Sequence, residues 1–176
     1  MAKDYCRLIM RWTLQRRLLD EAAHRDALTG LANRKAFFET LESERGGAVL
    51  YCDLDRFKPV NDELGHHAGD ELLRVVARRI TACVRTGDVV ARLGGDEFAV
   101  MCVGATRAQA GALAERIRNA FIEPFAIFGN SVRIGMSVGV AHSKDHLGDD
   151  VLEQADRALY LAKAGGGGVR WPQAVE

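Results

Sequence analysis

Asp96 and Glu97 are adjacent carboxylates in the stretch RLGGDEFAV, directly after a pair of glycines. The flanking runs Val89–Leu93 and Phe98–Val103 are short and apolar, which is typical of the two strands of a hairpin. The glycine pair predicts the turn between them, because both central residues of a tight hairpin turn need positive φ. A turn without side chains lets backbone approach a large anion, and carboxylates bind hard cations such as Mg²⁺. An ordinary solvated turn is the alternative for this stretch taken alone.

Asp53 and Asp55 are a second pair of carboxylates, at the end of the apolar run Ala48–Cys52. This run has the near-continuous hydrophobicity of a strand that is buried on both faces. Acidic groups at the end of such a strand are costly unless they are paired or metal-bound. A sheet that brings this strand to the hairpin makes Asp53 and Asp96 face each other, where bound cations could stabilise a phosphoryl transfer.

The polar stretch that follows offers groups for a nucleotide. Lys58 is a point charge suited to phosphate. Asn61 and Asp70 could match the edge of a purine, with the carboxylate accepting from ring and amino N–H groups. A plain surface position is the alternative for each of them. Asp70 could also simply cap the helix that the sequence predicts over Glu71–Arg85.

That helix breaks at Thr86-Gly87, so Arg85 and Asp88 flank a tight turn just before the hairpin strands. A guanidinium and a carboxylate at this spacing could bind a ligand. The alternative is a helix end with a local ion pair, which contributes little when exposed. Arg92 could likewise be an ordinary charge on an edge strand.

Two other helices carry start signals. Asn33 is expected to cap a helix that presents Phe37 and Leu41 inward and ends near Gly46-Gly47. Thr106 and Gln109 form a capping-box pattern. The helix after them presents its apolar side chains inward and places two arginines on solvated faces. Those apolar residues are Ala110, Leu113, Ala114, Ile117 and Phe121, and the arginines are Arg116 and Arg118.

The last third of the chain predicts a hairpin and a helix. Phe125–Phe128 and Ser131–Ala141 are expected to pair across Gly129-Asn130. Asp149 or Asp150 should cap a final helix, in whose last turn Lys163 is favoured by the helix dipole. That helix carries Leu152, Ala155, Leu159 and Ala162, and four glycines at 165–168 follow it.

The order of these elements indicates the fold. A buried strand, a crossover helix and a hairpin, followed by a helix and another strand, give βαββαβ. The expected class is therefore α+β, with a central antiparallel sheet of the ferredoxin-like or palm type flanked by helices.

A heptad-like pattern precedes these elements. Tyr5, Leu8, Trp12, Gln15, Leu19 and Ala22 are spaced 3, 4, 3, 4, 3. The spacing predicts a helix that ends near Asp26. It fits equally well an amphipathic helix lying on its own domain and a stalk that forms a dimer.

Composition agrees with one globular domain of 176 residues, 48% hydrophobic and 27% charged. Its 24 basic and 24 acidic residues cancel, which argues against nucleic acid as a partner. Cys6, Cys52, Cys83 and Cys102 have no paired spacing, so we expect a reducing, cytoplasmic setting and no zinc site. No apolar run reaches the ~20 residues of a membrane span, and Met1–Met10 does not resemble a signal peptide.

Four motifs in this order resemble the GGDEF domain, the catalytic module of diguanylate cyclases. The matching pieces are DALTGLANR at 26–34, DLDRFKPVND at 53–62 with GHHAGD at 65–70, GGDEF at 94–98 and YLAK at 160–163. The resemblance covers roughly residues 25–170. It implies a domain over 25–172, preceded by a linker or signalling helix over 1–24 and followed by a tail over 173–176.

The resemblance implies that two GTP molecules are joined into cyclic di-GMP with release of two pyrophosphates. The 3′-hydroxyl of one nucleotide attacks the α-phosphorus of the other. Each domain holds one GTP, so catalysis requires a second copy. Gly94 and Gly95 keep side chains away from the phosphates.

The same resemblance assigns roles at the metal and the hydroxyl. Asp53 and Asp96, with the carbonyl of Leu54, bind Mg²⁺, with Mn²⁺ as the alternative ion. Glu97 lies beside the metal and assists deprotonation of the hydroxyl. Such catalysis consists mostly of positioning and charge neutralisation.

It also assigns the nucleotide contacts. The backbone N–H groups of Phe57 and Lys58 hold the β- and γ-phosphates, together with the side chains of Lys58 and Lys163. Asn61 and Asp70 read guanine, which argues against a cyclase that acts on ATP.

The turn Arg85-Thr-Gly-Asp88 lies where such cyclases carry an RxxD inhibitory site for cyclic di-GMP, and Arg116 is where the family often adds a second arginine.

The sequence departs from the family at Gly167, where the family usually has a basic residue that contacts phosphate. Arg170 is a candidate substitute. A catalytically weak receptor for cyclic di-GMP is therefore the alternative function. The family usually follows a sensory or receiver module, so we expect either a C-terminal fragment or a small stand-alone protein.

Overall fold

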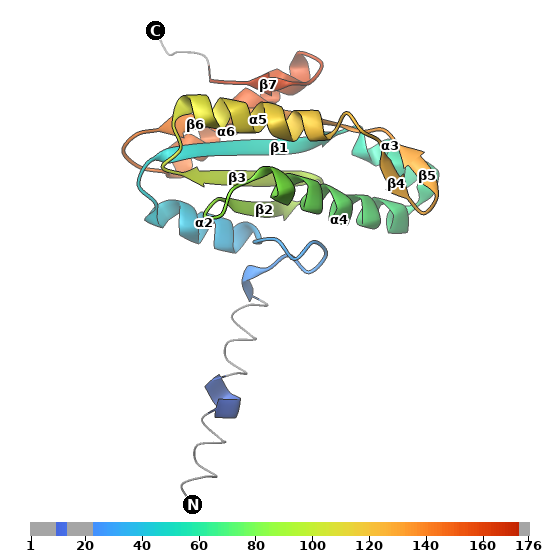
Figure 1. The fold of residues 1–176 in the computed structure, drawn as a ribbon, viewed down its shortest axis with the longest axis horizontal. Helices are drawn as coiled ribbons and strands as arrows, with labels where there is room; N and C mark the ends of the chain where they lie inside the picture. The colour runs from blue at the N-terminus through green and yellow to red at the C-terminus, as the bar shows by residue number, and fades with distance from the viewer. Residues whose placement is uncertain (1–9, 14–22, 173–176) are drawn as a thin grey trace, which may run out of the picture.

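The computed structural model describes residues 10–13 and 23–172, and its centre is a five-stranded sheet (Figure 1). The middle strand β1 (Gly47–Asp55) pairs antiparallel with β3 (Glu97–Val103) on one side and with β6 (Gly135–Ser143) on the other. Outside β3 lies β2 (Val89–Gly94), and β7 (Val169–Arg170) runs parallel to β6. The predicted α+β class and the order βαββαβ are confirmed.

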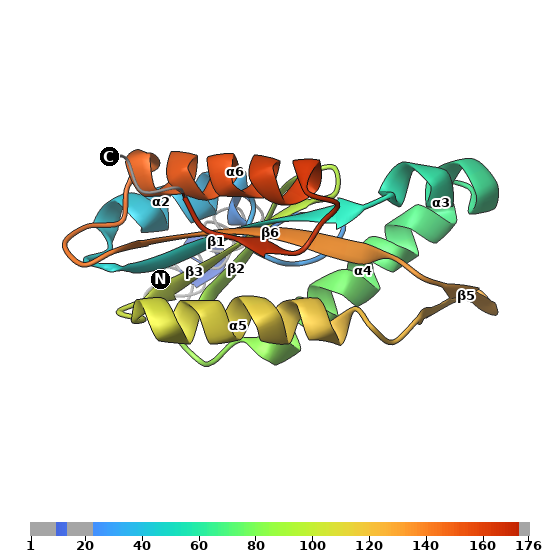
Figure 2. The same cartoon turned by 90° about the horizontal axis from the view of Figure 1, so that it is seen from above.

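Helices cover both faces of this sheet (Figure 2). On one face lie α2 (Arg34–Ser43) and α6 (Asp149–Ala164), and on the other lie α4 (His66–Cys83) and α5 (Arg107–Ala120). The short helix α3 (Phe57–Leu64) joins β1 to α4 at one end of the sheet. The sheet therefore ends in a region where α3, the end of β1 and the end of α6 come close.

The burial of β1 follows from this layering. Alternate side chains of a strand point to opposite faces, and here both faces are covered. Leu50 and Cys52 pack in the core beneath α4 and α5, whereas Val49 and Tyr51 pack beneath α2 and α6. The predicted strand, buried on both faces, is confirmed. It is longer than expected, because pairing with β6 continues to Asp55, so Asp53 lies within the strand.

The predicted helix starts are confirmed at two of three places. Asn33 accepts a hydrogen bond from the backbone N of Ala36 at 3.0 Å, and Thr106 and Gln109 form the capping box. The cap of α6 is instead Gly148, with no side-chain hydrogen bond. The prediction that Asp149 or Asp150 caps this helix is therefore wrong. Both occupy its first turn, where a carboxylate still interacts favourably with the helix dipole.

The stretch before α4 is also more helical than predicted. The sequence has few apolar residues there, and Val60 is the buried one on α3. Gly65, with φ of +82°, separates α3 from α4, and α4 then starts at His66. Asp70 therefore lies inside α4, and its interpretation as a helix cap is wrong. At the other end α4 stops at Cys83, two residues before Arg85.

Both predicted hairpins form, with shifted bounds. The turn between β2 and β3 consists of Gly95 and Asp96, whereas Gly94 ends β2 opposite Glu97. A register shift between Arg92 and Gly94 accounts for the displacement.

The second hairpin is shorter than predicted. It consists only of β4 (Phe125–Ile127) and β5 (Asn130–Val132), which form a separate two-stranded sheet. Beyond Ile134 the chain joins the central sheet as β6, where pairing with β1 replaces pairing with β4.

Several expectations concern the N-terminus and the cysteines. The heptad-like pattern falls largely on residues outside those that the structure describes, as does Cys6. Cys52, Cys83 and Cys102 are buried and free. Among residues 10–13 and 23–172 we find no helix with the length and hydropathy of a membrane span.

One glycine fixes how closely α6 packs on the sheet. A methyl group at Gly139 of β6 would collide with the carbonyl oxygen of Ala155 and the backbone N of Leu159. Gly139→Ala should therefore lower the free energy of unfolding by on the order of 3 kcal/mol, measured by urea denaturation. Gly111→Ala in α5 is the matched control, because the added methyl makes only ordinary contact with Trp171. The control should be neutral or stabilising by up to about 1 kcal/mol. Equal stabilities of the two variants would contradict this account of the packing.

Candidate functional site

The carboxylates predicted from two distant stretches do meet. Asp53 of β1 lies opposite Glu97 of β3 in the sheet register. The backbone N of Leu54 donates to the carbonyl oxygen of Asp96 at 3.3 Å. Asp53 is only 6% exposed, whereas Asp96 and Glu97 are half-buried. The structure thus brings three carboxylates together at one end of the middle strand.

Lys163 supplies the cation nearest to this group. Its Nζ lies 2.6 Å from Oδ2 of Asp53, and its side chain is 45% exposed. Burial raises the pKa of Asp53, the hydrogen bond with Lys163 lowers it, and the charges of Asp96 and Glu97 raise it further. The net shift is upward, so the ammonium only partly offsets the cost of the buried charge. The site retains a demand for positive charge.

This demand fits a hard divalent cation. The groups that the site offers to such a cation are oxygen atoms of carboxylates and of the backbone. Within the described part of the chain, no group of three or more His, Cys, Asp or Glu side chains is arranged to hold a metal ion by itself. An open set of this kind suits Mg²⁺, which usually takes one or two carboxylates and completes its shell with water and substrate phosphates.

Tyr51 orients Glu97, a contact that the sequence did not reveal. The Tyr51 hydroxyl donates to Oε2 of Glu97 at 3.4 Å. Burial, aided by the charge of Glu97, raises the pKa of Tyr51 to about 12. The phenol therefore stays protonated and available as a donor. In the sequence Tyr51 belongs to an apolar run, and no local pattern indicates that its hydroxyl contacts Glu97.

Arg92 does more than an edge-strand charge would. Its Nη1 lies 3.1 and 3.2 Å from the two carboxylate oxygens of Asp26, and its Nε and Nη2 donate to the carbonyl oxygen of Gly95 at 3.0 and 2.8 Å. Asp26 also accepts from the backbone N and the hydroxyl of Thr29. The side chain of Arg92 is 14% exposed. The modest interpretation of Arg92 was therefore wrong: it ties the turn at 26–29 to the tip of the hairpin.

Four of the residues expected to hold the nucleotide lie on α3 and α4. Phe57 and Lys58 are the first two residues of α3, where backbone N–H groups have no partner within the helix. Asn61 lies one turn further on and packs against α4, because a methyl group at Gly69 would collide with its Oδ1. Asp70 follows Gly69 directly. The structure thus brings Asn61 to the part of α4 that carries Asp70.

Arg85, Asp88 and Arg116 share a separate hollow of about 190 Å³ between β3 and α5. Nε of Arg85 lies 3.2 Å from Oδ1 of Asp88, and Arg85 also donates to the carbonyl oxygen of Val103 at 2.8 Å. The Asp88 side chain is only 4% exposed, although Arg85 is 54% exposed. Arg116 donates to the carbonyl oxygen of Cys83 at 2.8 Å. Arg116 and Arg118 are both exposed, as expected, and Arg118 pairs with Glu115. Arg116 also lines the hollow.

A larger hollow of about 700 Å³ adjoins the carboxylates at the end of β1. Lys163 and Gly167 line it, together with two arginines that the sequence did not single out, Arg56 and Arg133. Arg170, the expected substitute for a basic residue at 167, does not line this hollow. Arg56 and Arg133 lie far apart in the sequence in unrelated local patterns, so only the fold reveals that they share a cavity.

Chemically, the arrangement can bind a cation on carboxylates, an anion on Lys163 and exposed N–H groups, and a purine edge on Asn61 and Asp70.

Comparison with known proteins shows the family to which the chain belongs. Residues 23–168 match the family model "Diguanylate cyclase, GGDEF domain". The bifunctional diguanylate cyclase/cyclic di-GMP phosphodiesterase MucR of Pseudomonas aeruginosa is 41% identical over an alignment of 158 residues that covers 84% of this chain. The chain spans only 23% of the length of MucR.

Two solved structures are similar over most of the chain. The GGDEF domain of TpbB from Pseudomonas aeruginosa is 37% identical, with a TM-score of 0.80 over 85% of this chain and 95% of that one. The coiled coil and GGDEF domain of DgcB from Caulobacter crescentus, solved in complex with c-di-GMP, is 30% identical, with a TM-score of 0.88 over 95% of both chains. The family model and these likenesses agree, and this chain belongs to the GGDEF domain family.

Proposed function

We propose that this chain is the catalytic unit of a diguanylate cyclase, which condenses two GTP into cyclic di-GMP and two pyrophosphates. The observation that carries the proposal is the meeting of Asp53 with the Asp96–Glu97 hairpin beside Lys163. Family membership and the diguanylate cyclase activity in the name of MucR support it. The domain over residues 25–172 works in the cytoplasm, behind a sensory or receiver module.

Asp53, Asp96 and the Leu54 carbonyl would hold Mg²⁺, or Mn²⁺ in its place. When bound, the ion neutralises phosphate charge and favours ionisation of the attacking 3′-hydroxyl. Glu97, oriented by Tyr51, accepts the hydroxyl proton. Gly94 and Gly95 leave the hairpin tip open to the phosphates.

The rest of the chain positions the nucleotide. The N–H groups of Phe57 and Lys58, with the side chains of Lys58 and Lys163, hold the β- and γ-phosphates. Asn61 and Asp70 read the guanine edge. Each domain binds one GTP, so two copies must face each other before a hydroxyl can reach the α-phosphorus of the other nucleotide.

Product returns to the hollow formed by Arg85, Asp88 and Arg116 and lowers the rate. Arginine can stack on guanine and pair with phosphate, and a carboxylate accepts from guanine N–H groups. The same hollow favours a second candidate function, a receptor for cyclic di-GMP with little turnover. The binding of c-di-GMP by the DgcB protein is consistent with either role.

Asp96→Ala should abolish synthesis but leave product binding intact. Loss of a metal ligand removes charge neutralisation in the transition state, so we expect turnover to fall by roughly 10²-fold or more. The purified chain is incubated with GTP and Mg²⁺, and nucleotides are separated by chromatography, with bound nucleotide released by heating. Asp145→Ala, at an exposed loop position, is the control. Retained synthesis in Asp96→Ala would refute the metal assignment, and product bound without any turnover by the parent chain would favour the receptor.

Asp53→Asn should stabilise the metal-free protein while abolishing turnover. The upward pKa shift means that ionised Asp53 is disfavoured in the folded state, and asparagine removes that cost. The melting temperature of the variant should exceed that of the parent at neutral pH, in chelator. Added Mg²⁺ with a GTP analogue whose link between the α- and β-phosphates cannot be cleaved should raise the melting temperature of the parent more than that of the variant. A variant less stable than the parent in chelator would show that the pair with Lys163 is net stabilising.

Arg85→Ala should relieve feedback. The parent's rate should fall as cyclic di-GMP accumulates, whereas the variant's rate should stay nearly constant under the same conditions. Arg118→Ala is the matched control, because Arg118 is an exposed arginine of α5 that does not line the hollow. Equal product inhibition in all three proteins would show that feedback does not act through this hollow. Circular dichroism checks that Asp88, left without its side-chain partner, has not unfolded the turn.

A further inference from the structure

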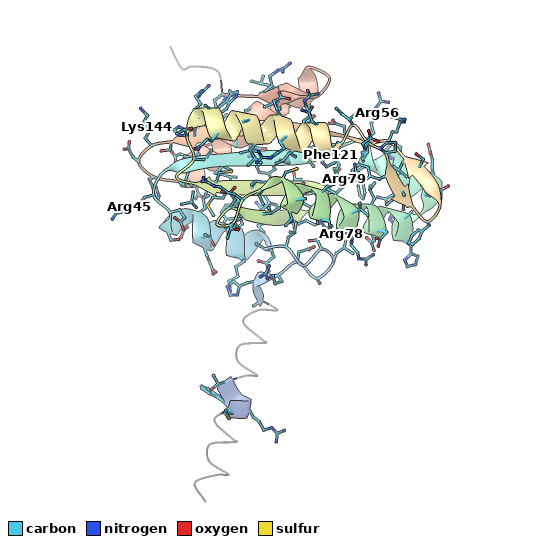
Figure 3. The ribbon with its side chains drawn as sticks, viewed as in Figure 1. Arg45, Arg56, Arg78, Arg79, Phe121 and Lys144 are labelled. Carbon is cyan, nitrogen blue, oxygen red and sulfur yellow. The ribbon has the colours of Figure 1, made fainter. Side chains whose placement is uncertain are left out.

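The hollow of about 700 Å³ at the end of β1 is lined by more basic than acidic side chains. It lies between the end of β1, the start of β6 and the C-terminal ends of α5 and α6, and Arg56, Arg133 and Lys163 line it. Figure 3 shows Arg56 at this end of the molecule, near Phe121, which borders the hollow at the end of α5. Leu54 and Lys163 belong both to this hollow and to the carboxylate site. The two are therefore continuous.

The two arginines have unused binding capacity. Both are exposed, and neither has a hydrogen bond or ion pair with any residue that the structure describes. Arg79 shows the contrast, since its guanidinium donates to three carbonyl oxygens and lies over the ring of Phe125. Asp55 is the one acid that lines the hollow within the described residues, and it already accepts from the Ser137 hydroxyl at 2.6 Å. The charges of the arginines are therefore left for a ligand.

The backbone around the hollow favours a ligand with several oxygens. Gly166 and Gly167 form part of its wall with φ of +85° and +104°, conformations that L side chains rarely adopt. A basic side chain at 167 would be strained there, and a bare wall lets phosphates approach the backbone. Arg56 is itself held at φ of +64°, and such strained residues cluster at binding sites. Arg133 comes from the segment just before β6, and Arg56 comes from the N-cap of α3.

We propose that Arg56 and Arg133, together with Lys163, bind the two terminal phosphates of the nucleotide and the same pyrophosphate unit after its release. Arg133 takes the place of a basic residue at Gly167, and Arg170 does not. Guanidinium groups suit this ligand because they pair with phosphate oxygens in a bidentate manner. The inference rests on the proposed function for the identity of the nucleotide. Recognition of a diphosphate unit is a property of the hollow itself.

The test measures binding by calorimetry, with Mg²⁺ present, of GTP, GMP and inorganic pyrophosphate. Arg133→Ala and Arg56→Ala should each weaken GTP and pyrophosphate binding by roughly tenfold, because each removes charge-assisted hydrogen bonds. Both should leave GMP binding within about twofold, since GMP lacks the two terminal phosphates. Arg133→Lys should recover part of the loss. Arg157→Ala, an exposed arginine of α6 paired with Glu153, is the control.

The outcomes separate this inference from the proposed function. Unchanged GTP and pyrophosphate affinity in both folded variants overturns the inference, even if the parent chain makes cyclic di-GMP. Selective loss of GTP and pyrophosphate binding supports it, even if the parent shows no turnover. Weaker pyrophosphate binding with unchanged GTP binding overturns it as well, because the proposal places the terminal phosphates of the bound nucleotide on the same arginines. Equal loss for GMP, or a parent chain that binds neither GTP nor pyrophosphate, also overturns it.

Discussion

The constraint on which the site depends is the charge of Asp53 on the middle strand. β1 is hydrogen-bonded on both sides and covered on both faces, so water cannot solvate this carboxylate well. A buried charge needs a partner, and the fold supplies Lys163 from the last turn of α6. The close packing of α6 on Gly139 brings that lysine within reach. The position of the helix, the glycine of β6 and the carboxylate are thus parts of one arrangement.

The hairpin is held to this arrangement by groups far from it in sequence. Arg92 fastens the tip to Asp26, which is itself fixed in the turn at Thr29, and Tyr51 holds Glu97 from the neighbouring strand. The tip can therefore be short, rich in glycine and still fixed in position. A site meant to hold charged oxygens at set distances requires such support, because positioning is most of what it contributes to catalysis.

Local patterns were enough to predict the parts of the fold that local physics determines. The buried strand, the caps at Asn33 and Thr106 and the acidic hairpin each have their cause within a few residues. The helix α3 was missed, because Val60 is its one buried residue. A single apolar position among polar residues does not show the 3.6-residue periodicity of an amphipathic helix. Partners 66 residues apart, such as Asp26 and Arg92, leave no local signal. The same holds for Arg56 and Arg133, which line one hollow only because β1 pairs with β6.

The residues that conflict with stability in this fold gather at one end of the sheet. Asp53 has a raised pKa, and Arg56 has a positive φ, which L side chains rarely adopt. All the buried polar side-chain atoms that the structure describes have hydrogen-bond partners, so these conflicts do not come from unpaired buried groups. Selection for stability alone would remove such conflicts, because each has a simple remedy in a neutral or paired side chain. Their position where the carboxylates adjoin the cationic hollow is the arrangement expected where a cation and a polyphosphate are bound side by side.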